Sequence, residues 1–350
     1  MVLRELKKLG DEVERRWLES EYRYEDFPEI AEKLLEELPL TENLAAPDIL
    51  EWALSADSPI QSGGGSFSDL PVIAYNGKSF VLQLLVWNEG IADIHQHSFS
   101  GAFRVLEGSS LHSSYEIQTV EHVSQFLSIV DLNCLNTEIV RKGDVRAIKS
   151  GSGLTHSAFH LDSPTISLVL RTRAEPWNSP SYSIIRPNIM IANSAFDDDA
   201  ELNFLVRGLF LLRHLRDASF REVLIKQARS MDFASICHLV SRAYMVIGSD
   251  IDDLVEDLRP KYGEKVVHLE EIFATFERND VIKTYRRSGR TKEERVFAAS
   301  LLASGDKNQF DQTIQHYFGD HAPEKTAKWS ENLPMRMASY WQQLQRRKSS

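Results

Sequence analysis

The stretch Gly90–Gly108, G-I-A-D-I-H-Q-H-S-F-S-G-A-F-R-V-L-E-G, decides how the rest of the chain is interpreted. It carries His95 and His97 two residues apart in a segment of strand-forming character. Side chains at positions i and i+2 of a strand point to the same face of the sheet. Two imidazoles that point inward from one strand make half of a metal site. The pattern therefore predicts two metal ligands on one inward-facing strand.

A third histidine follows on a strand of its own. His156 stands in G-S-G-L-T-H-S-A-F-H (residues 151–160), shortly after the turn-forming pair Gly143-Asp144. The order of the two motifs resembles the two-part metal signature of the cupin barrels. None of residues 98–103 is a carboxylate, so the pattern indicates a site of three histidines. Three neutral imidazoles leave a divalent metal its full charge and open positions for dioxygen, water or substrate.

The composition is that of a globular protein of more than one domain. The chain has 350 residues, of which 42% are hydrophobic and 26% charged, and this length suits two domains. A net charge of -11 argues against a nucleic-acid partner. No segment approaches the roughly 18 apolar residues of a membrane span, and residues 1–16 lack the apolar core of a signal peptide. We therefore expect a cytoplasmic protein without a membrane contact. Cys134 and Cys237 form no motif and are expected to be reduced thiols.

The pattern of apolar and turn-forming residues changes twice along the chain and predicts three parts. Residues 1–60 are an N-terminal helical segment, residues 61–192 a barrel, and residues 193–350 a helical C-terminal domain. The expected fold class is a mainly β, antiparallel, jelly-roll-like cupin barrel with N-terminal helices and an all-α C-terminal domain. The expected strands are 79–87, 102–106, 111–118, 137–140, 145–148, 155–160 and 165–173. The expected helices include 27–38, 46–54, 220–228, 233–247, 251–258, 269–278, 292–303, 309–318 and 335–346.

Two blocks of the barrel resemble the cysteine dioxygenase family of thiol dioxygenases. The first is Gly77–Gly108, and the second runs from G-D-V-R-A-I-K-S-G-S-G-L-T-H (143–156) to T-I-S-L-V-L-R (165–171). The missing carboxylate is part of the resemblance. The resemblance implies a mononuclear Fe(II) ion held by His95, His97 and His156. The family adds both atoms of dioxygen to a thiol sulfur and forms a sulfinic acid.

The chain departs from that family at several positions. Gly101 stands at the family's cysteine, and Arg171 at the tyrosine that is joined to it in animal members. Val169 replaces a relay histidine, so that only Ser167 remains of the Ser–His–Tyr relay. The arginine that holds the carboxylate of the amino acid has no counterpart, because no Arg lies between residues 24 and 94. These departures argue against cysteine itself as the substrate.

Two polar residues on the expected strands are candidate substrate contacts in place of that arginine. Gln83 alternates with apolar residues and should face the barrel interior, where a buried amide needs a partner. Arg171 ends the apolar run I-S-L-V-L-R, and a buried guanidinium can bind a carboxylate through two hydrogen bonds. The alternative for Arg171 is a strand end that reaches solvent and pairs with a surface acid. The alternative for Gln83 is a purely structural amide.

The remaining histidines carry weaker signals. His160 shares the strand face of His156, but four residues of strand rise place it about 13 Å away. We therefore expect it at the barrel mouth rather than at the metal. His112 and His122 are expected at the surface or rim, and the histidines of the helical half lack ligand spacing. Three aromatic residues are candidates either for the pocket wall or for simple core: Tyr75, Trp87 and Phe103.

Two functions follow from these patterns. The first is a non-haem Fe(II) oxygenase, thiol-dioxygenase-like, that adds dioxygen to a small, acidic substrate at the three-histidine site. Iron is the expected cofactor, although three histidines suit other divalent metals. The second is a diverged barrel that acts as a binding or scaffold module, with its helical domain engaging a protein partner. That domain also offers a surface for self-association, since helix 202–215 is rich in Leu and Phe.

Overall fold

The computed structural model describes residues 2–39, 44–56, 58–61, 68–88, 91–173, 175–177, 180–193, 199–288 and 291–346. The glycine run 63–65, Gly90 and residues 347–350 lie outside this part. The strands are β1 (Leu70–Asn76), β2 (Phe80–Trp87), β3 (Ile91–Gln96), β4 (Gly101–Glu107), β5 (Ser109–Ser124), β6 (Leu127–Arg141), β7 (Val145–Ile148), β8 (Thr155–His160), β9 (Thr165–Thr172), β10 (Tyr182–Ile185) and β11 (Ile189–Ala192). The α-helices are α1 (Val2–Glu19), α2 (Phe27–Glu37), α3 (Ala46–Ala53), α4 (Ala200–His214), α5 (Phe220–Ser230), α6 (Phe233–Ile247), α7 (Asp250–Tyr262), α8 (Val267–Ser288), α9 (Lys292–Ala303), α10 (Lys307–Phe318), α11 (Ala322–Glu331) and α12 (Met335–Arg346).

Two antiparallel sheets make up the β part. The first has the strand order β1-β2-β9-β4-β7, and the second the order β10-β11-β6-β5-β8-β3. The second sheet closes on itself because Ser183 of β10 pairs with His95 of β3. In the first sheet β9 lies between β2 and β4, so strands that are far apart in the sequence share one ladder.

The strands of the first sheet are apolar on both faces. They therefore appear in the sequence as continuous runs of apolar residues. On β2, Leu82 and Leu84 pack toward the N-terminal helices, whereas Leu85 faces the space between the sheets. On β9, Leu168 packs toward the helices and Val169 faces inward. The period of two thereby separates a helix-covered face from the face that carries the candidate site.

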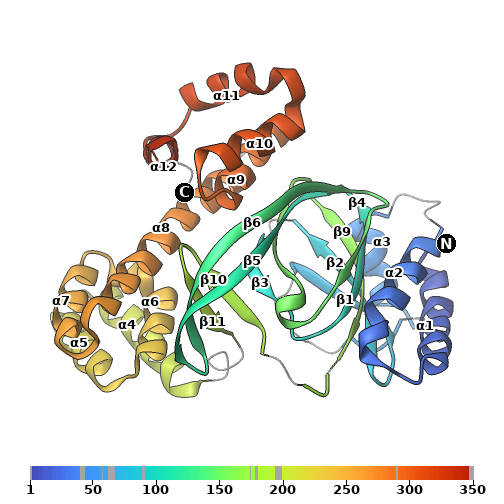
Figure 1. The fold of residues 1–350 in the computed structure, drawn as a ribbon, viewed down its shortest axis with the longest axis horizontal. Helices are drawn as coiled ribbons and strands as arrows, with labels where there is room; N and C mark the ends of the chain where they lie inside the picture. The colour runs from blue at the N-terminus through green and yellow to red at the C-terminus, as the bar shows by residue number, and fades with distance from the viewer. Residues whose placement is uncertain are drawn as a thin grey trace.

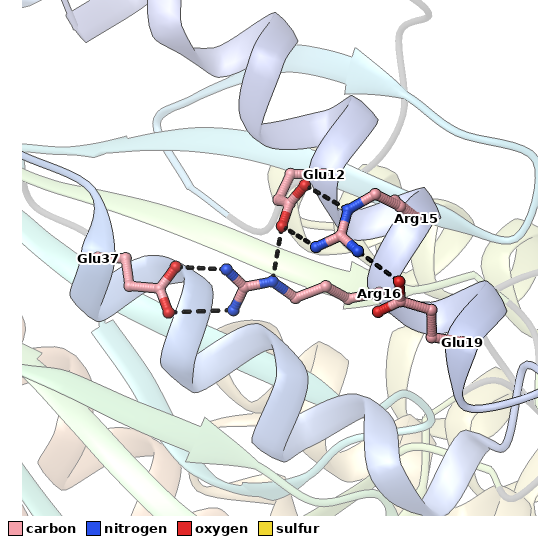
Figure 2. Close-up of polar contacts among 5 residues, drawn as sticks. All are labelled: Glu12, Arg15, Arg16, Glu19 and Glu37. Carbon is pink, nitrogen blue, oxygen red and sulfur yellow. Dashed lines mark hydrogen bonds and ion pairs between the residues drawn. The ribbon is translucent and has the colours of Figure 1, made fainter.

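Helices α1–α3 cover the outer face of the first sheet (Figure 1). Trp17 of α1 is fully buried and packs against Phe27 of α2 and Phe80 of β2. At the surface, Arg16 of α1 binds Glu37 of α2 within a small network of ion pairs (Figure 2). Such surface pairs contribute at most about 1 kcal/mol each, whereas one buried large apolar side chain contributes about 1.5–3 kcal/mol. The apolar contacts therefore hold these helices on the sheet.

A buried arginine fixes the end of α2. Arg104 of β4 donates hydrogen bonds to the main-chain carbonyls of Leu35 and Leu38. The last carbonyls of a helix have no partner within the helix, and a cation is favourable at this end of the helix dipole. Burial lowers the pKa of Arg104. The two carbonyls accept hydrogen bonds that the guanidinium would otherwise donate to water.

Helices α4–α12 form two groups, and each group shares an apolar core with the second sheet (Figure 1). Helices α4–α7 and part of α8 share a core with Leu127, Ile189 and Ile191 of the sheet. Helices α9–α12 and the end of α8 share another core with Leu111 and Phe159. The long helix α8 thus belongs to both groups. Among the described residues, none of these helices is long and apolar enough to cross a membrane.

The architecture confirms the predicted fold class, with an antiparallel barrel, N-terminal helices and an all-α C-terminal part. The strand 137–140 belongs to a much longer strand, β6, which begins at Leu127. Strands β1, β10 and β11 and helix α11 were not predicted. Strands β10 and β11 have only four residues each. The domain boundaries at residues 60 and 192 stay a prediction.

Candidate metal centre

Two adjacent strands bring the three predicted histidines together. His95 of β3 pairs directly with His156 of β8, and directly opposed residues have Cβ atoms about 4.5–5.5 Å apart. His97 follows His95 by two residues, and its ring centroid lies 4.5 Å from that of His95. Among the residues that the structure describes, these three form the one group of at least three potential metal ligands.

A β-bulge sets the direction in which His95 points. Ala92 pairs with Ala158, but the next pair along the ladder is His95 with His156. Strand β3 therefore takes three steps where β8 takes two, which is the definition of a bulge. Because of the extra residue, both Ala92 and His95 face the cavity between the sheets. Without the bulge, the alternation of the strand would turn one of them away.

The candidate ligand atoms lie close enough together for one small ion. Nε2 of His97 and Nε2 of His156 are 2.9 Å apart, and the ligand atoms of all three histidines lie within 4.8 Å of one another. Nitrogens about 2.1 Å from a tetrahedral metal are about 3.4 Å from each other, so small ring rotations would complete the geometry. Three imidazoles without a carboxylate suit a divalent transition metal, and the residues present therefore fit such an ion.

A main-chain carbonyl orients His95. Its Nδ1 lies 2.7 Å from the carbonyl oxygen of Asp93, so Nδ1 carries the proton and Nε2 is left as the ligand atom. The carboxylate of Asp93 in turn pairs with Nζ of Lys283 on α8 at 2.8 Å. The C-terminal helices thereby brace the residue that orients a candidate ligand.

The electrostatic environment keeps the three imidazoles neutral. Burial lowers the pKa of His95 below its usual value of 6.5 and lowers the pKa of His97 and His156 further still. The neighbouring imidazole of His95 adds to this lowering at both other residues. A neutral imidazole offers the lone pair that a metal needs, so the folded chain presents its candidate ligands in the binding form.

A small cavity borders the three histidines. Its volume is about 50 Å³, which is room for about three to five water-sized groups. Its polar lining consists of histidines and Ser167. The remaining wall is apolar and is made by Leu85, Trp87, Ala92, Phe99, Phe103, Ile148, Ala158 and Val169.

Two further histidines line this cavity, and one of them corrects an expectation. His112 was expected at the surface or rim, but its ring stacks on Phe103 with centroids 5.2 Å apart, and its Nε2 lies 2.9 Å from Oγ of Ser110. His160 stacks on Trp87 at 4.4 Å. Because β8 is unbroken, His160 stays outside the metal group, as predicted. Burial lowers the pKa of His112 to about 4 and that of His160 well below 6.5.

Gln83 and Arg171 bind each other instead of lining the cavity. Nε of Arg171 donates to Oε1 of Gln83 at 2.9 Å, and its Nη1 donates to the carbonyl of Thr172 at 3.2 Å. The guanidinium carbon lies 4.8 Å from the ring centroid of Phe99, and that ring lies 4.5 Å from His97. The alternative for Arg171 was an ion pair with a surface acid, and within the described residues no acid is among its partners. One aromatic ring therefore separates this arginine from the candidate metal group.

The position that aligns with the family's cysteine has no room for a side chain. Gly101 pairs with Arg171 across β4 and β9. A Cβ atom on Gly101 would lie 2.0 Å from the carbonyl oxygen of Leu170. No side chain fits at that distance unless the strand moves. The backbone of this chain therefore excludes a cysteine beside the site.

The other sequence candidates are divided between cavity and surface. Trp87 and Phe103 line the cavity, whereas Tyr75 lies on the helix-covered face and donates to Asp11 of α1. His122 is exposed, as predicted. The missed cavity residue, His112, could have been found only from the register of β5 on β8, which places it opposite Ala158 and beside His156.

Comparison with solved structures gives distant likenesses. No protein-family model and no curated protein matches the chain. The DMSP lyase DddQ from Ruegeria pomeroyi DSS-3 is 15% identical with a TM-score of 0.21, over 32% of this chain and 46% of that one, so less than half of that lyase is spanned. Hydroquinone 1,2-dioxygenase from Sphingomonas sp. TTNP3 is 8% identical with a TM-score of 0.24, over 31% and 68%. A cupin-2 domain containing protein from Shewanella frigidimarina is 14% identical with a TM-score of 0.20, over 30% and 82%. At these scores the likenesses carry no argument about the activity of this chain.

Proposed function

We propose that the chain is a non-haem iron oxygenase of the thiol-dioxygenase type, with Fe(II) held by His95, His97 and His156. The observation that carries the proposal is the convergence of three neutral, buried imidazoles, without a carboxylate, on one small apolar cavity. Such a donor set leaves open coordination positions for two further ligands. When bound there, iron would supply the redox centre at which dioxygen and a thiolate meet.

The protein residues contribute orientation and the exclusion of water. The Asp93 carbonyl fixes the ring of His95, and Phe99 packs on His97 at a centroid distance of 4.5 Å. The cavity admits only about three to five water-sized groups. Its apolar wall keeps bulk water from the reacting atoms, which strengthens every electrostatic contact within the site. Only a small substrate fits.

We further propose that Arg171 binds an acidic group of the substrate and that Gln83 positions it. The guanidinium is part-buried and receives only neutral acceptors from Gln83 and Thr172. A carboxylate would supply the counter-charge that burial requires, through hydrogen bonds of the charge-assisted kind. Phe99 lies between Arg171 and His97, so its ring would have to turn for one substrate to reach both.

The first experiment measures iron by elemental analysis after anaerobic loading, for wild type and His95→Ala side by side. About one iron per chain in wild type, lost in the variant, supports the site. Oxygen uptake is then measured with small thiols, and consumption that depends on iron and thiol supports the reaction. Iron in neither protein, or equal iron in both, contradicts the assignment.

The alternative function, a binding or scaffold module, makes the opposite prediction for that experiment. In support of it, Phe204 and Leu211 of α4 are exposed apolar residues, at 79% and 57% of their full accessibility. A scaffold would retain its partner in the His95→Ala variant and would bind no stoichiometric metal. The intact group of three histidines favours the oxygenase.

A further inference from the structure

His160 is a buried polar side chain with no role in the site as described so far. It is only 3% exposed and lines the same cavity as the three candidate ligands. Within the described residues, neither its Nδ1 nor its Nε2 has a hydrogen-bond partner. Trp87 fixes the plane of the ring by stacking on it at 4.4 Å with an interplanar angle of 23°. The ring is therefore held in place while both of its polar atoms are left unsatisfied.

Each of the other cavity histidines has a polar partner. His95 has the Asp93 carbonyl, His97 and His156 have each other, and His112 has Ser110. Buried polar groups are almost always hydrogen-bonded, and an exception calls for a missing partner. A neutral imidazole has one donor and one acceptor. A hydroxyl or a primary amide matches that pair, because each can donate and accept.

We propose that His160 binds a neutral hydroxyl or amide group at the end of the substrate remote from the metal. This inference rests on the proposed function, since it assigns the other end of the substrate to the three histidines. It adds a specificity-determining residue and a substrate class. Apart from the acidic group assigned to Arg171, which does not line the cavity, the substrate has a metal-binding atom at one end of the cavity and an uncharged hydrogen-bonding group at the other.

The dimensions of the cavity limit the length of that molecule. His156 and His160 are four residues apart on one continuous strand, which corresponds to about 13 Å between their Cα atoms. Both side chains extend into a cavity of about 50 Å³, so three to five non-hydrogen atoms fill it. A chain of two or three carbons between the sulfur and the hydroxyl makes four or five non-hydrogen atoms in all and stays within this volume.

The charges near His160 favour a neutral group over a cationic one. Arg286 donates to the main-chain carbonyl of His160. Its guanidinium and that of Arg295 are near enough to oppose a positive charge on the ring. They oppose an ammonium group in the same place by the same repulsion. We therefore expect a mercapto alcohol to bind better than an amino thiol of equal length.

The test uses Co(II)-loaded full-length protein and two series of probes. The first series is the ω-mercapto alcohols with two to five carbons, and the second is the alkanethiols with the same number of non-hydrogen atoms. Changes in the cobalt absorption spectrum report binding of sulfur at the metal. We expect the two- or three-carbon alcohol to bind about tenfold more tightly than its alkanethiol, as one well-made hydrogen bond allows.

Three variants make the result specific to His160. His160→Phe keeps the stacking on Trp87 and removes both polar atoms, so the preference for the alcohol should fall to about one. His160→Gln retains one donor and one acceptor and should restore part of the preference. His122→Phe alters an exposed histidine and should behave as wild type. An unchanged preference in His160→Phe overturns the inference.

A second readout separates this inference from the proposed function. In zinc-loaded protein with nitrogen-15-labelled histidine, the resonances of His160 are assigned by comparison with His160→Phe. They should shift with the mercapto alcohol and not with the alkanethiol. If cobalt responds to no thiol while these resonances still distinguish the probes, thiol chemistry fails and the role of His160 stands. Equal responses to both probes, or none to either, overturn the role of His160.

Discussion

The two ends of the cavity use the same residue type for different purposes. At one end His95, His97 and His156 converge, with the Nε2 atoms of the last two 2.9 Å apart. At the other end His160 lies flat on the ring of Trp87. Convergence leaves lone pairs for a metal, whereas stacking fixes the ring of His160 and leaves its edge for a neutral ligand. The neighbours of each imidazole, rather than its identity, separate the two ends.

The largest effect is expected from a variant at the convergent end. His97→Ala should reduce iron affinity by more than about 100-fold, because even residues that only orient metal ligands contribute 10–100-fold. His160→Phe, at the stacked end, should keep about one iron per chain. Elemental analysis after anaerobic loading measures both. Loss of iron from both variants would remove the distinction between the two ends.

Metal removal tests the same contrast through stability. A metal at 100 times its dissociation constant should add about 2.7 kcal/mol to the free energy of unfolding. Wild type and His160→Phe should lose this increment with a chelator, and His97→Ala should show no increment. Urea unfolding with and without zinc measures it. A stabilisation of equal size in His97→Ala would place the ion elsewhere.

A smaller effect is expected at Arg171, which lies behind Phe99. Arg171→Met should weaken the binding of 3-mercaptopropionate to the cobalt protein by about 10- to 100-fold, since it removes charge-assisted hydrogen bonds. The binding of 3-mercapto-1-propanol should change little, because its hydroxyl is assigned to His160. Both affinities come from the cobalt spectrum. Equal losses for the acid and the alcohol would mean that Arg171 only supports the fold.

The smallest effect concerns the dependence of stability on pH. The pKa of His160 lies well below 6.5 in the fold and near 6.5 in the unfolded chain. Between these values the unfolded state binds the extra proton, so the free energy of unfolding falls as the pH falls. One such histidine accounts for about 1.4 kcal/mol per pH unit.

His160→Phe should therefore flatten the slope of stability of the metal-free protein below pH 6.5 and leave it unchanged above pH 7.5. Urea unfolding at pH 7.5, 6.0 and 5.0 measures the slope. His122→Phe, at an exposed position, should keep the slope of wild type. A His160→Phe slope equal to that of wild type would show that this imidazole is protonated equally in both states.

Local pattern was enough to predict most of one end of the cavity. His95 and His97 share a face because of the period of two, and this needs no knowledge of a partner strand. The inward position of Gln83 was also evident from its apolar neighbours, although its partner, Arg171, lies on a strand 88 residues away in sequence. Each of the two was expected to need a partner, and the hydrogen bond between their side chains shows that they satisfy each other.

The rest of the site depends on features that no local pattern contains. His112 enters the cavity because β5 pairs with β8, and β5 is a 16-residue strand whose register is set by its whole length. The bulge between Ala92 and His95 adds one residue to β3 without a Gly or Pro to mark it. Strands β10 and β11 have only four residues each, too few for a clear alternation.

The central place of β9 in the first sheet has a consequence for the newly made chain. The apolar sides of α1 and α2 pack on a sheet whose middle strand begins at Thr165, whereas α2 ends at Glu37. At about 5–20 residues per second, synthesis of the intervening chain takes roughly 6–26 seconds. During that time Trp17 and Phe27 have no complete surface to cover them. The N-terminal helices thus expose apolar side chains on the ribosome until the sheet that covers them is complete.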